Sequence, residues 1–167
     1  MTSILIIGGA RSGKSRRAEA RLAAFVGQPI YIATAQALDT EMERRISRHR
    51  DRRGPEWALR ETPLDLVQAL LETDGRGPRL VDCLTLWLSN LMHADRDWQK
   101  ETTTLAAVLA RQHAPVILVS NEVGQGIVPD NALARAFRDA AGLINQQISE
   151  AADEVEFVVA GLPIKLK

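Results

Sequence analysis

Short apolar runs alternate with amphipathic stretches along the chain. The runs lie at residues 4–7, 29–34, 79–82, 116–120 and 155–159, and a short sixth run lies at 164–166. Those in the middle of the chain are continuously apolar, which is typical of parallel strands covered on both faces. The pattern therefore predicts a sheet whose strands are mostly parallel.

Helical periodicity fills the intervals between these runs. The expected helices lie at residues 14–26, 40–50, 63–72, 85–92, 97–112 and 131–151. Thr40 and Glu43 form a capping box for the second helix, and Asp130 is expected to cap the last one. The last helix has an apolar side made of Leu133, Phe137, Ile144 and Ile148. Alternating strands and helices predict a single-domain α/β fold over residues 1–167, with a mostly parallel sheet flanked by helices.

Composition and charge restrict the partners of this domain. The chain has 167 residues, and its 21 basic and 21 acidic side chains balance, so no overall bias toward nucleic acid is expected. No apolar run approaches the roughly 20 residues of a membrane span. The single cysteine excludes an internal disulfide and fits a reducing cytoplasm.

Residues 8–15 carry a phosphate-binding pattern between the first strand and the first helix. The segment reads Gly8-Gly9-Ala10-Arg11-Ser12-Gly13-Lys14-Ser15 and matches the P-loop spacing Gly-x-x-x-x-Gly-Lys-Ser. The backbone N–H groups of such a loop surround phosphate oxygens, and the following helix adds the positive end of its dipole. Lys14 is expected to reach the β- and γ-phosphates, and Ser15 to bind Mg²⁺.

An acidic residue, Asp82, ends the third apolar run. At this place in a P-loop protein a carboxylate is expected to act on the metal or on its water shell. Asp82 could also cap the helix that follows, since aspartate is a good N-cap. The polar segment 121–126, after the fourth run, also suits ligand contact, because ligands gather at the carboxyl ends of parallel strands. Thr34 and Glu61 are further candidates.

Seven of the ten residues 44–53 are basic, His49 included, in an otherwise neutral chain. Basic residues in the last turn of a helix complement its dipole, so this cluster could be only a solvated helix end. Arginines also bind phosphate oxygens well, and a triphosphate is expected nearby. His49 shares a helical face with Met42 and Ile46, which is typical of a packed histidine as well as of a functional one.

Four sequence blocks, taken together, are similar to one protein family. They are Gly8–Ser15 with Arg16, Ala18 and Glu19; Tyr31–Gln36 with Asp39, Glu41 and Met42; Arg45-Ile46-x-x-His49-Arg50 with Arg53 and Trp57; and Asn121-Glu122-Val123-Gly124-x-Gly126-Ile127-Val128-Pro129 with Asn131, Arg135, Phe137, Arg138, Asp139, Gly142 and Asn145. Ala152-Asp153-Glu154-Val155 and Gly161…Lys165 complete the pattern, so the resemblance covers essentially the whole chain. The chain thus resembles the bifunctional adenosylcobinamide kinase / adenosylcobinamide-phosphate guanylyltransferase family of cobalamin synthesis.

This resemblance implies a two-step reaction on a corrinoid. Members phosphorylate the hydroxyl of the aminopropanol arm of adenosylcobinamide with GTP or ATP. They then transfer GMP from GTP to the new phosphate through a guanylyl-histidine, which gives adenosylcobinamide-GDP and pyrophosphate. Of the three histidines, only His49 lies in the matching block, and Arg48 stands where some relatives have a second histidine.

The resemblance also implies site residues and an assembly. The nucleotide contacts fall on Gly8, Gly9, Ala10, Arg11, Ser12, Gly13, Lys14, Ser15, Thr34, Ala35, Gln36, Asp51, Arg52, Arg53, Gly54, Glu61 and Asp82. Ser15 and Asp82 would bind Mg²⁺. Members have a RecA-like P-loop NTPase fold and form homo-oligomers, with a trimer expected here and an active site shared between subunits.

Two other functions remain to be separated from this one. A P-loop small-molecule kinase without nucleotidyl transfer would use the arginine cluster only as a lid. A GTP-dependent switch would need a guanine-reading Asn-Lys-x-Asp motif, which the sequence does not contain.

Overall fold

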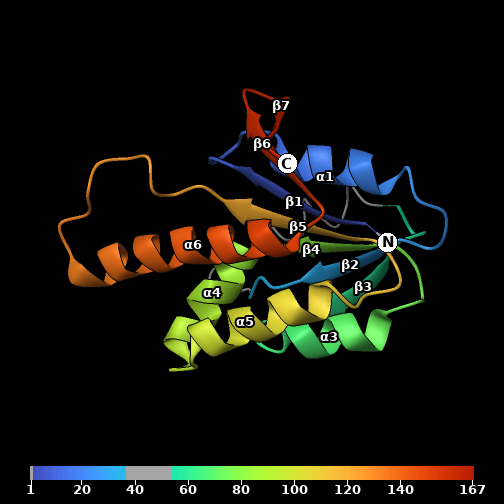
Figure 1. Cartoon of the computed structure of the whole chain (residues 1–167), viewed down its shortest axis with the longest axis horizontal. Helices are drawn as coiled ribbons and strands as arrows, with labels where there is room; N and C mark the ends of the chain where they lie inside the picture. Colours follow the sequence, from blue (N-terminus) through green and yellow to red (C-terminus); the bar gives the residue numbers. More distant parts are fainter. Residues whose placement is uncertain (1, 37–53) are drawn as a thin grey trace.

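A seven-stranded sheet with helices on both faces makes up the fold (Figure 1). The computed structural model describes residues 2–36 and 54–167. Its strands are β1 (Ser3–Gly8), β2 (Ile30–Ala33), β3 (Ala58–Glu61), β4 (Arg79–Asp82), β5 (Val116–Asn121), β6 (Glu154–Val159) and β7 (Leu162–Lys165). Its helices are α1 (Lys14–Leu22), α3 (Leu66–Thr73), α4 (Leu84–His93), α5 (Trp98–Leu109) and α6 (Ala132–Ala151). The helix predicted at 40–50 lies outside the described residues.

The strand order is β3-β2-β4-β5-β1-β6-β7, and all neighbours are parallel except β6 and β7. The predicted mostly parallel α/β sheet is therefore confirmed. The sequence did not predict β3, because this edge strand has three exposed residues and no apolar run. The short sixth run belongs to β7, which begins two residues before the predicted start.

Two hydrophobic clusters separate the helices by face. Alternate residues of the strands, such as Ile4, Ile6 and Ile117, pack against α1 on one face. Their neighbours, such as Leu5 and Leu118, pack against α3, α4, α5 and α6 on the other. This alternation follows from the period-two geometry of strands, and it places the helices in two layers, one on each face of the sheet.

Helix α6 extends past the carboxyl edge of the sheet. Its Asn145 donates a hydrogen bond from Nδ2 to the carbonyl of Asn121, the last residue of β5, at 3.2 Å. The N-terminal part of α6 therefore lies beyond that strand end, as Figure 1 shows. This explains why Leu133 is 66% exposed although its spacing predicts a buried position, whereas Ile144 and Ile148 are buried as predicted.

Several predicted helix boundaries are wrong, and two of them have clear local reasons. Asp130 does not cap α6, because the N-cap is Asn131, whose Oδ1 accepts the N–H of Ala134 at 2.7 Å. Helix α1 ends at Leu22 instead of residue 26, and a turn follows in which the Phe25 N–H bonds to the Leu22 carbonyl. Asparagine and aspartate cap equally well, so adjacent candidates are hard to separate from sequence.

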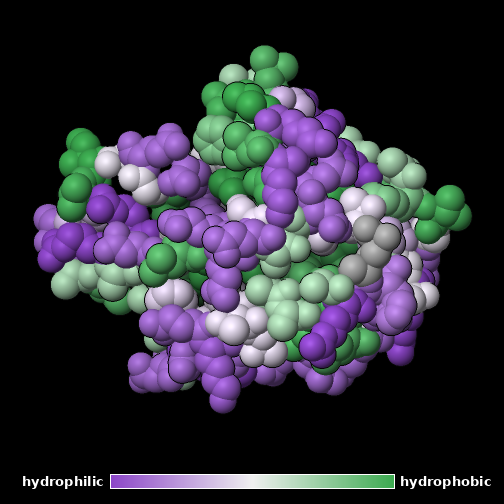
Figure 2. Space-filling view, in the orientation of Figure 1, coloured by the Kyte–Doolittle hydropathy of each residue, from purple (hydrophilic) through white to green (hydrophobic). Residues whose placement is uncertain are grey.

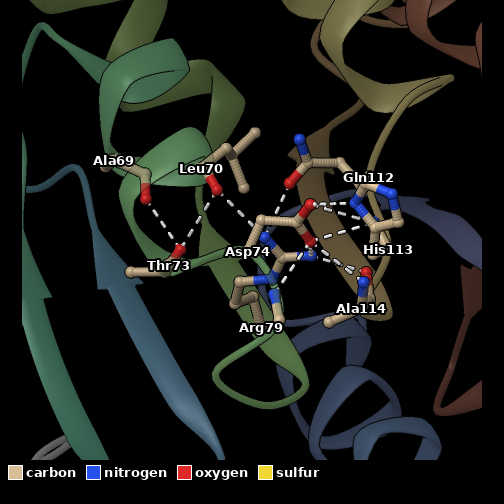
Figure 3. Close-up of polar contacts among 9 residues, drawn as sticks. Ala69, Leu70, Thr73, Asp74, Arg79, Gln112, His113 and Ala114 are labelled. Atoms are coloured by element: carbon tan, nitrogen blue, oxygen red, sulfur yellow. Dashed lines mark hydrogen bonds and ion pairs between the residues drawn. The ribbon is translucent and has the colours of Figure 1, made fainter.

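A buried polar cluster fixes the start of β4, at the amino edge of the sheet (Figure 3). The Arg79 guanidinium is fully buried and donates to the carbonyls of Leu70 and Ala114, to Gln112 and to the Asp74 carboxylate, which lies 3.0 Å away. Asp74 also accepts the backbone N–H groups of His113 and Ala114 at 2.9–3.0 Å. Because nearly every polar atom of the cluster is used within the fold, we assign it a structural role.

Replacing Asp74 by asparagine is expected to lower the free energy of unfolding by about 3 kcal/mol, because it leaves a buried guanidinium without its counter-charge. Burial acts to raise the pKa of Asp74, but the hydrogen bonds from Ala114 and His113 and the charge of Arg79 outweigh it, so the pKa lies below its usual 3.8. The unfolded chain therefore binds this proton more readily than the folded one. The stabilisation by Asp74 is present above pH 3.8 and is lost as the pH falls below that value.

Urea unfolding of both proteins at neutral pH and at about pH 3 checks this prediction. The difference between wild type and Asp74→Asn should shrink in acid. Asp65→Asn is the matched control, since Asp65 also pairs with an arginine but is 69% exposed, and surface pairs contribute at most about 1 kcal/mol. Equal losses in the two variants would contradict the structural assignment.

Exposed hydrophobic surface gathers at the β6–β7 hairpin, at the top of Figure 2. Val159, Leu162 and Ile164 are 47%, 70% and 51% exposed. Ile127 and Val128, in the loop before α6, are 97% and 61% exposed.

Within the described residues, no helix has the length and the hydropathy needed to cross a bilayer.

Candidate nucleotide-binding site

The predicted P-loop connects β1 to α1 at the carboxyl edge of the sheet. Gly13 caps α1 with a φ of 96°, a conformation that glycine adopts without strain. A Cβ on Gly8 would lie 2.5 Å from Ser12 Oγ and 2.7 Å from the Val158 carbonyl, so only glycine fits at the start of the loop. The loop backbone and the N-terminus of α1 together form a site for phosphate oxygens.

Lys14 is held inside this loop. Its side chain leaves the residue 8% exposed, and Nζ donates to the carbonyl of Gly9 at 3.0 Å. A lysine in this place directs its charge over the concave side of the loop, where the β- and γ-phosphates of a nucleotide bind. The geometry thus fits the role predicted for Lys14.

Helix α1 is tied to the sheet behind the P-loop by a buried carboxylate. Glu156 on β6 is 3% exposed and accepts from Arg17 Nε at 2.7 Å and from Arg21 Nη1 at 2.5 Å. The hydrogen bond from Arg17 lowers the pKa of Glu156 against the opposing effect of burial. The ion pairs fix α1 relative to the strands, and with it the orientation of its N-terminal N–H groups.

The structure brings Ser15 and Asp82 together, as predicted. Ser15 Oγ lies 3.5 Å from Asp82 Oδ2, across the gap between α1 and the end of β4. The alternative role of Asp82 as a helix cap is wrong, because the N-cap of α4 is Cys83, whose side chain makes no capping hydrogen bond. Burial raises the pKa of the Cys83 thiol to about 11, so this cysteine is an unreactive packing residue.

A tyrosine that the sequence analysis did not single out holds Asp82. The Tyr31 hydroxyl, on β2, donates to Asp82 Oδ2 at 3.0 Å, the same oxygen that faces Ser15. Tyr31 is 7% exposed, and Trp57 packs edge-on against its ring with centroids 6.3 Å apart. A buried tyrosine hydroxyl needs a polar partner. This requirement is the signal by which the sequence could have indicated a polar contact for Tyr31.

Ser15 and Asp82 suit Mg²⁺ by their chemistry. A hydroxyl and a carboxylate are hard oxygen ligands, and Mg²⁺ is usually bound by one or two such groups together with substrate phosphates and water. Within residues 2–36 and 54–167, no three His, Cys, Asp or Glu side chains form a cluster that could hold a metal ion. The residues that the structure describes therefore fit a metal carried by the nucleotide better than an all-protein metal site.

Two further segments support the P-loop from opposite sides. The N–H of Glu122, which follows β5, donates to the Gly8 carbonyl at 3.1 Å. The N–H of Gly161, at the turn of the β6–β7 hairpin, donates to the Ser12 carbonyl at 2.8 Å. The first contact agrees with the expected importance of segment 121–126. Gly161 belongs to the closing part of the family pattern, but no role was expected for it.

Other predicted nucleotide contacts lie farther from the P-loop. Thr34 is fully buried, and its hydroxyl bonds to both the N–H and the carbonyl of Cys83 at 2.8 Å, so it joins the ends of β2 and β4. Ala35 and Gln36 follow it, and Gln36 is exposed. Glu61 is exposed at the end of β3, four strand spacings or about 19 Å from β1.

Gly54 precedes β3 in the chain, and its carbonyl accepts the N–H of Trp57 at 3.3 Å. His49, Asp51, Arg52 and Arg53 lie outside the described residues. The structure thus brings together Gly8–Ser15 and Asp82, and it places Glu61 at the same edge of the sheet, two strands from Asp82, since both residues pair in register with Ala33.

The chain is similar to known proteins along nearly its whole length. The profile of a family described as cobinamide kinase / cobinamide phosphate guanyltransferase matches residues 4–166. The bifunctional adenosylcobalamin biosynthesis protein CobP of Pseudomonas aeruginosa is 52% identical over 169 residues, which cover 98% of this chain and 96% of that protein. The bifunctional adenosylcobalamin biosynthesis protein CobU of Salmonella typhimurium is 45% identical, covering 98% and 99%.

Among solved structures, the P4 protein from bacteriophage phi6 in complex with ADP has a similar fold, with a TM-score of 0.50 and 12% sequence identity. The match covers 97% of this chain, which spans about half of the P4 chain. At this identity the similarity shows the fold alone, and that fold is a P-loop NTPase fold with a mostly parallel sheet.

Proposed function

We propose that a single phosphate-binding loop serves two reactions in this chain, which belongs to the cobinamide kinase / cobinamide phosphate guanyltransferase family. The enzyme phosphorylates cobinamide and then transfers a guanylyl group to the product, in the biosynthesis of adenosylcobalamin. The observation that supports the role of the described residues is the convergence of Lys14, Ser15 and Asp82 at the carboxyl edge of the sheet.

In the kinase step, the P-loop binds the phosphates of GTP or ATP. The hydroxyl of the corrinoid arm attacks the γ-phosphorus, the bond from that phosphorus to the β–γ bridging oxygen breaks, and the nucleoside diphosphate leaves as the hydroxyl proton is released. Lys14 and the N-terminus of α1 stabilise the charge on the phosphate oxygens. Ser15 and Asp82 would hold Mg²⁺, which supplies further neutralisation of this charge when bound.

In the second step, His49 is the nucleophile. An imidazole nitrogen attacks the α-phosphorus of GTP, the bond to the β-phosphate oxygen breaks, and pyrophosphate leaves. An oxygen of the corrinoid phosphate then attacks the same phosphorus, which releases the imidazole and forms the diphosphate product. Two displacements replace one difficult transfer, and the arginines near His49 in the sequence would neutralise the phosphates.

A double-label experiment tests this function. With GTP labelled at the γ-phosphate, label should appear on cobinamide. With GTP labelled at the α-phosphate, label should first appear on the protein as an acid-labile, base-stable adduct, and should pass to the corrinoid when cobinamide phosphate is added. A simple P-loop kinase would give the first result without the second, and a binding protein or switch would give neither.

Tyr31→Phe is expected to weaken the affinity of the site for Mg²⁺. The hydroxyl that positions Asp82 is lost while the ring and its contact with Trp57 remain, and such supporting contacts change metal affinity by roughly tenfold. The Mg²⁺ concentration for half-maximal kinase activity should rise accordingly. Calorimetric titration of GTP binding at several Mg²⁺ concentrations gives a second measurement. Trp57→Phe serves as the control, because it keeps the Tyr31 hydroxyl. If the Mg²⁺ dependence of Tyr31→Phe is the same as that of this control, Tyr31 does not support the metal site.

We further propose that residues 1–167 act as one domain, that the enzyme works in the cytoplasm with the corrinoid as its substrate, and that it forms a homo-oligomer, a trimer by the family resemblance. The exposed apolar residues at the β6–β7 hairpin and in the loop before α6 support the assembly, because such surface favours subunit contact. Sedimentation velocity measures the oligomeric state, and a monomer at all concentrations would contradict it.

A further inference from the structure

We propose that a groove between the C-terminal end of α4 and the N-terminal ends of α5 and α6 binds the corrin ring of the substrate, an inference that rests on the function proposed above. The groove has a volume of about 840 Å³. Small-molecule pockets range over about 300–1,000 Å³, so this one suits a large ligand. The P-loop residues do not line it, so it is separate from the phosphate site.

The lining of the groove combines large apolar groups with a few polar ones. Met92, Trp98, Leu133 and Phe137 provide apolar and aromatic surface. Ser89 and Asn131 lie among them. A corrin ring has broad apolar faces and a rim of amide side chains, so it needs flat apolar contact together with neutral hydrogen-bonding groups. The lining offers both kinds of contact.

The charges in the groove are largely satisfied within the fold. Arg96 pairs with Asp65 at 3.0 Å and with Glu101. Asp97 caps α5 by accepting the N–H of Lys100 at 3.0 Å, and Asn131 caps α6. Arg96, the one arginine among the described residues that line the groove, is already paired with two carboxylates, so this lining is poorly suited to a nucleotide or another polyanion. This favours the corrinoid over a second nucleotide as the occupant.

The groove stands at a suitable distance from the P-loop. Asn121 pairs in register with Gly8, the first P-loop residue, and its carbonyl contacts Asn145 of α6. Phe137 lies eight residues earlier on the same helix, which corresponds to about 12 Å along its axis. The substrate's reacting hydroxyl is at the end of a side arm of the ring. A ring held in the groove can therefore present this arm to the phosphates.

Leu133 provides a way to test the groove. It is 66% exposed and lies at the apolar side of α6, where residues 2–36 and 54–167 leave it largely uncovered. Leu143, on the same helix, is 53% exposed but does not line the groove. The two leucines therefore form a matched pair, in which only the first would contact the ring.

The experiment compares Leu133→Ser with Leu143→Ser. Losing apolar contact with a ligand costs roughly tenfold in its binding or in kcat/KM. Leu133→Ser should raise the KM for cobinamide about tenfold, and equilibrium dialysis should show the same loss of cobinamide affinity. Leu143→Ser should behave as wild type. Labelling of the protein by α-labelled GTP, measured without corrinoid, should be equal in all three proteins.

Ala134→Trp, which fills the groove without removing a contact, should also weaken cobinamide binding. Unchanged cobinamide affinity in both groove variants would overturn the inference. The inference would also be overturned if Leu133→Ser changed the oligomeric state, measured by sedimentation, but left the affinity for cobinamide unchanged. The groove would then be a contact with a second copy of the chain. If the wild-type protein shows neither labelling by α-labelled GTP nor phosphorylation of cobinamide, the proposed function is contradicted. Equilibrium dialysis with cobinamide would still test the groove.

Discussion

Lys14→Ala should abolish both γ-phosphate transfer to cobinamide and protein labelling by α-labelled GTP. One charged group in the phosphate-binding loop serves both reactions, so its loss weakens stabilisation of both transition states, and we expect each rate to fall at least about a hundredfold. Radiolabel transfer under single-turnover conditions measures both rates in one preparation.

A comparison with Lys100→Ala makes this result specific. Lys100 is exposed on α5, away from the P-loop, and its replacement should leave both rates unchanged. Circular dichroism should show that Lys14→Ala is folded, because the buried side chain is replaced by a smaller one. If either activity survives in Lys14→Ala within a few fold, the shared-loop proposal is wrong.

His49→Ala is expected to separate the two reactions. GMP transfer should fall by about a thousandfold or more, because the residue that would form the covalent intermediate is gone. Phosphorylation of cobinamide should continue, since the P-loop and Asp82 are untouched. The α-label on the protein should disappear while cobinamide phosphate accumulates, and chromatography of the products measures both.

His113→Ala serves as the histidine control. Its ring is 86% exposed and contacts Asp74 at the amino edge of the sheet, opposite to the P-loop. It should retain both activities. Survival of GMP transfer in His49→Ala would show that the intermediate, if one forms, is on another residue.

The strands could be predicted where the apolar pattern of a segment agrees with its burial in the folded sheet. Apolar runs such as 116–120 are buried on both faces of the sheet, so their composition alone identifies them as strands. Strand β3 was not predictable, because an exposed edge strand needs no apolar run and forms through its pairing with β2. The exposure of Leu133 was also not predictable, since helical spacing does not show where a helix passes the end of a sheet.

For the candidate site, the residues adjacent in sequence were the easiest to predict. The P-loop is continuous, so its spacing carries its geometry, and Asp82 follows from the position of a strand end. Tyr31 and Gly161 depend on contacts between distant segments, with Asp82 and Ser12 respectively. Glu61 was assigned by family resemblance, and the sheet order separates it from the P-loop by three intervening strands.

The order of the strands has a consequence for how the protein is made. β1 lies between β5 and β6, yet it ends at Gly8 whereas its partners begin at Val116 and Glu154. As the chain leaves the ribosome, the apolar β1 has two unpaired backbone edges until most of the polypeptide has been synthesised. Such long-range pairing slows folding and exposes aggregation-prone edges. Production of this enzyme should therefore benefit from chaperones that bind nascent chains and cover these edges until the partner strands are made.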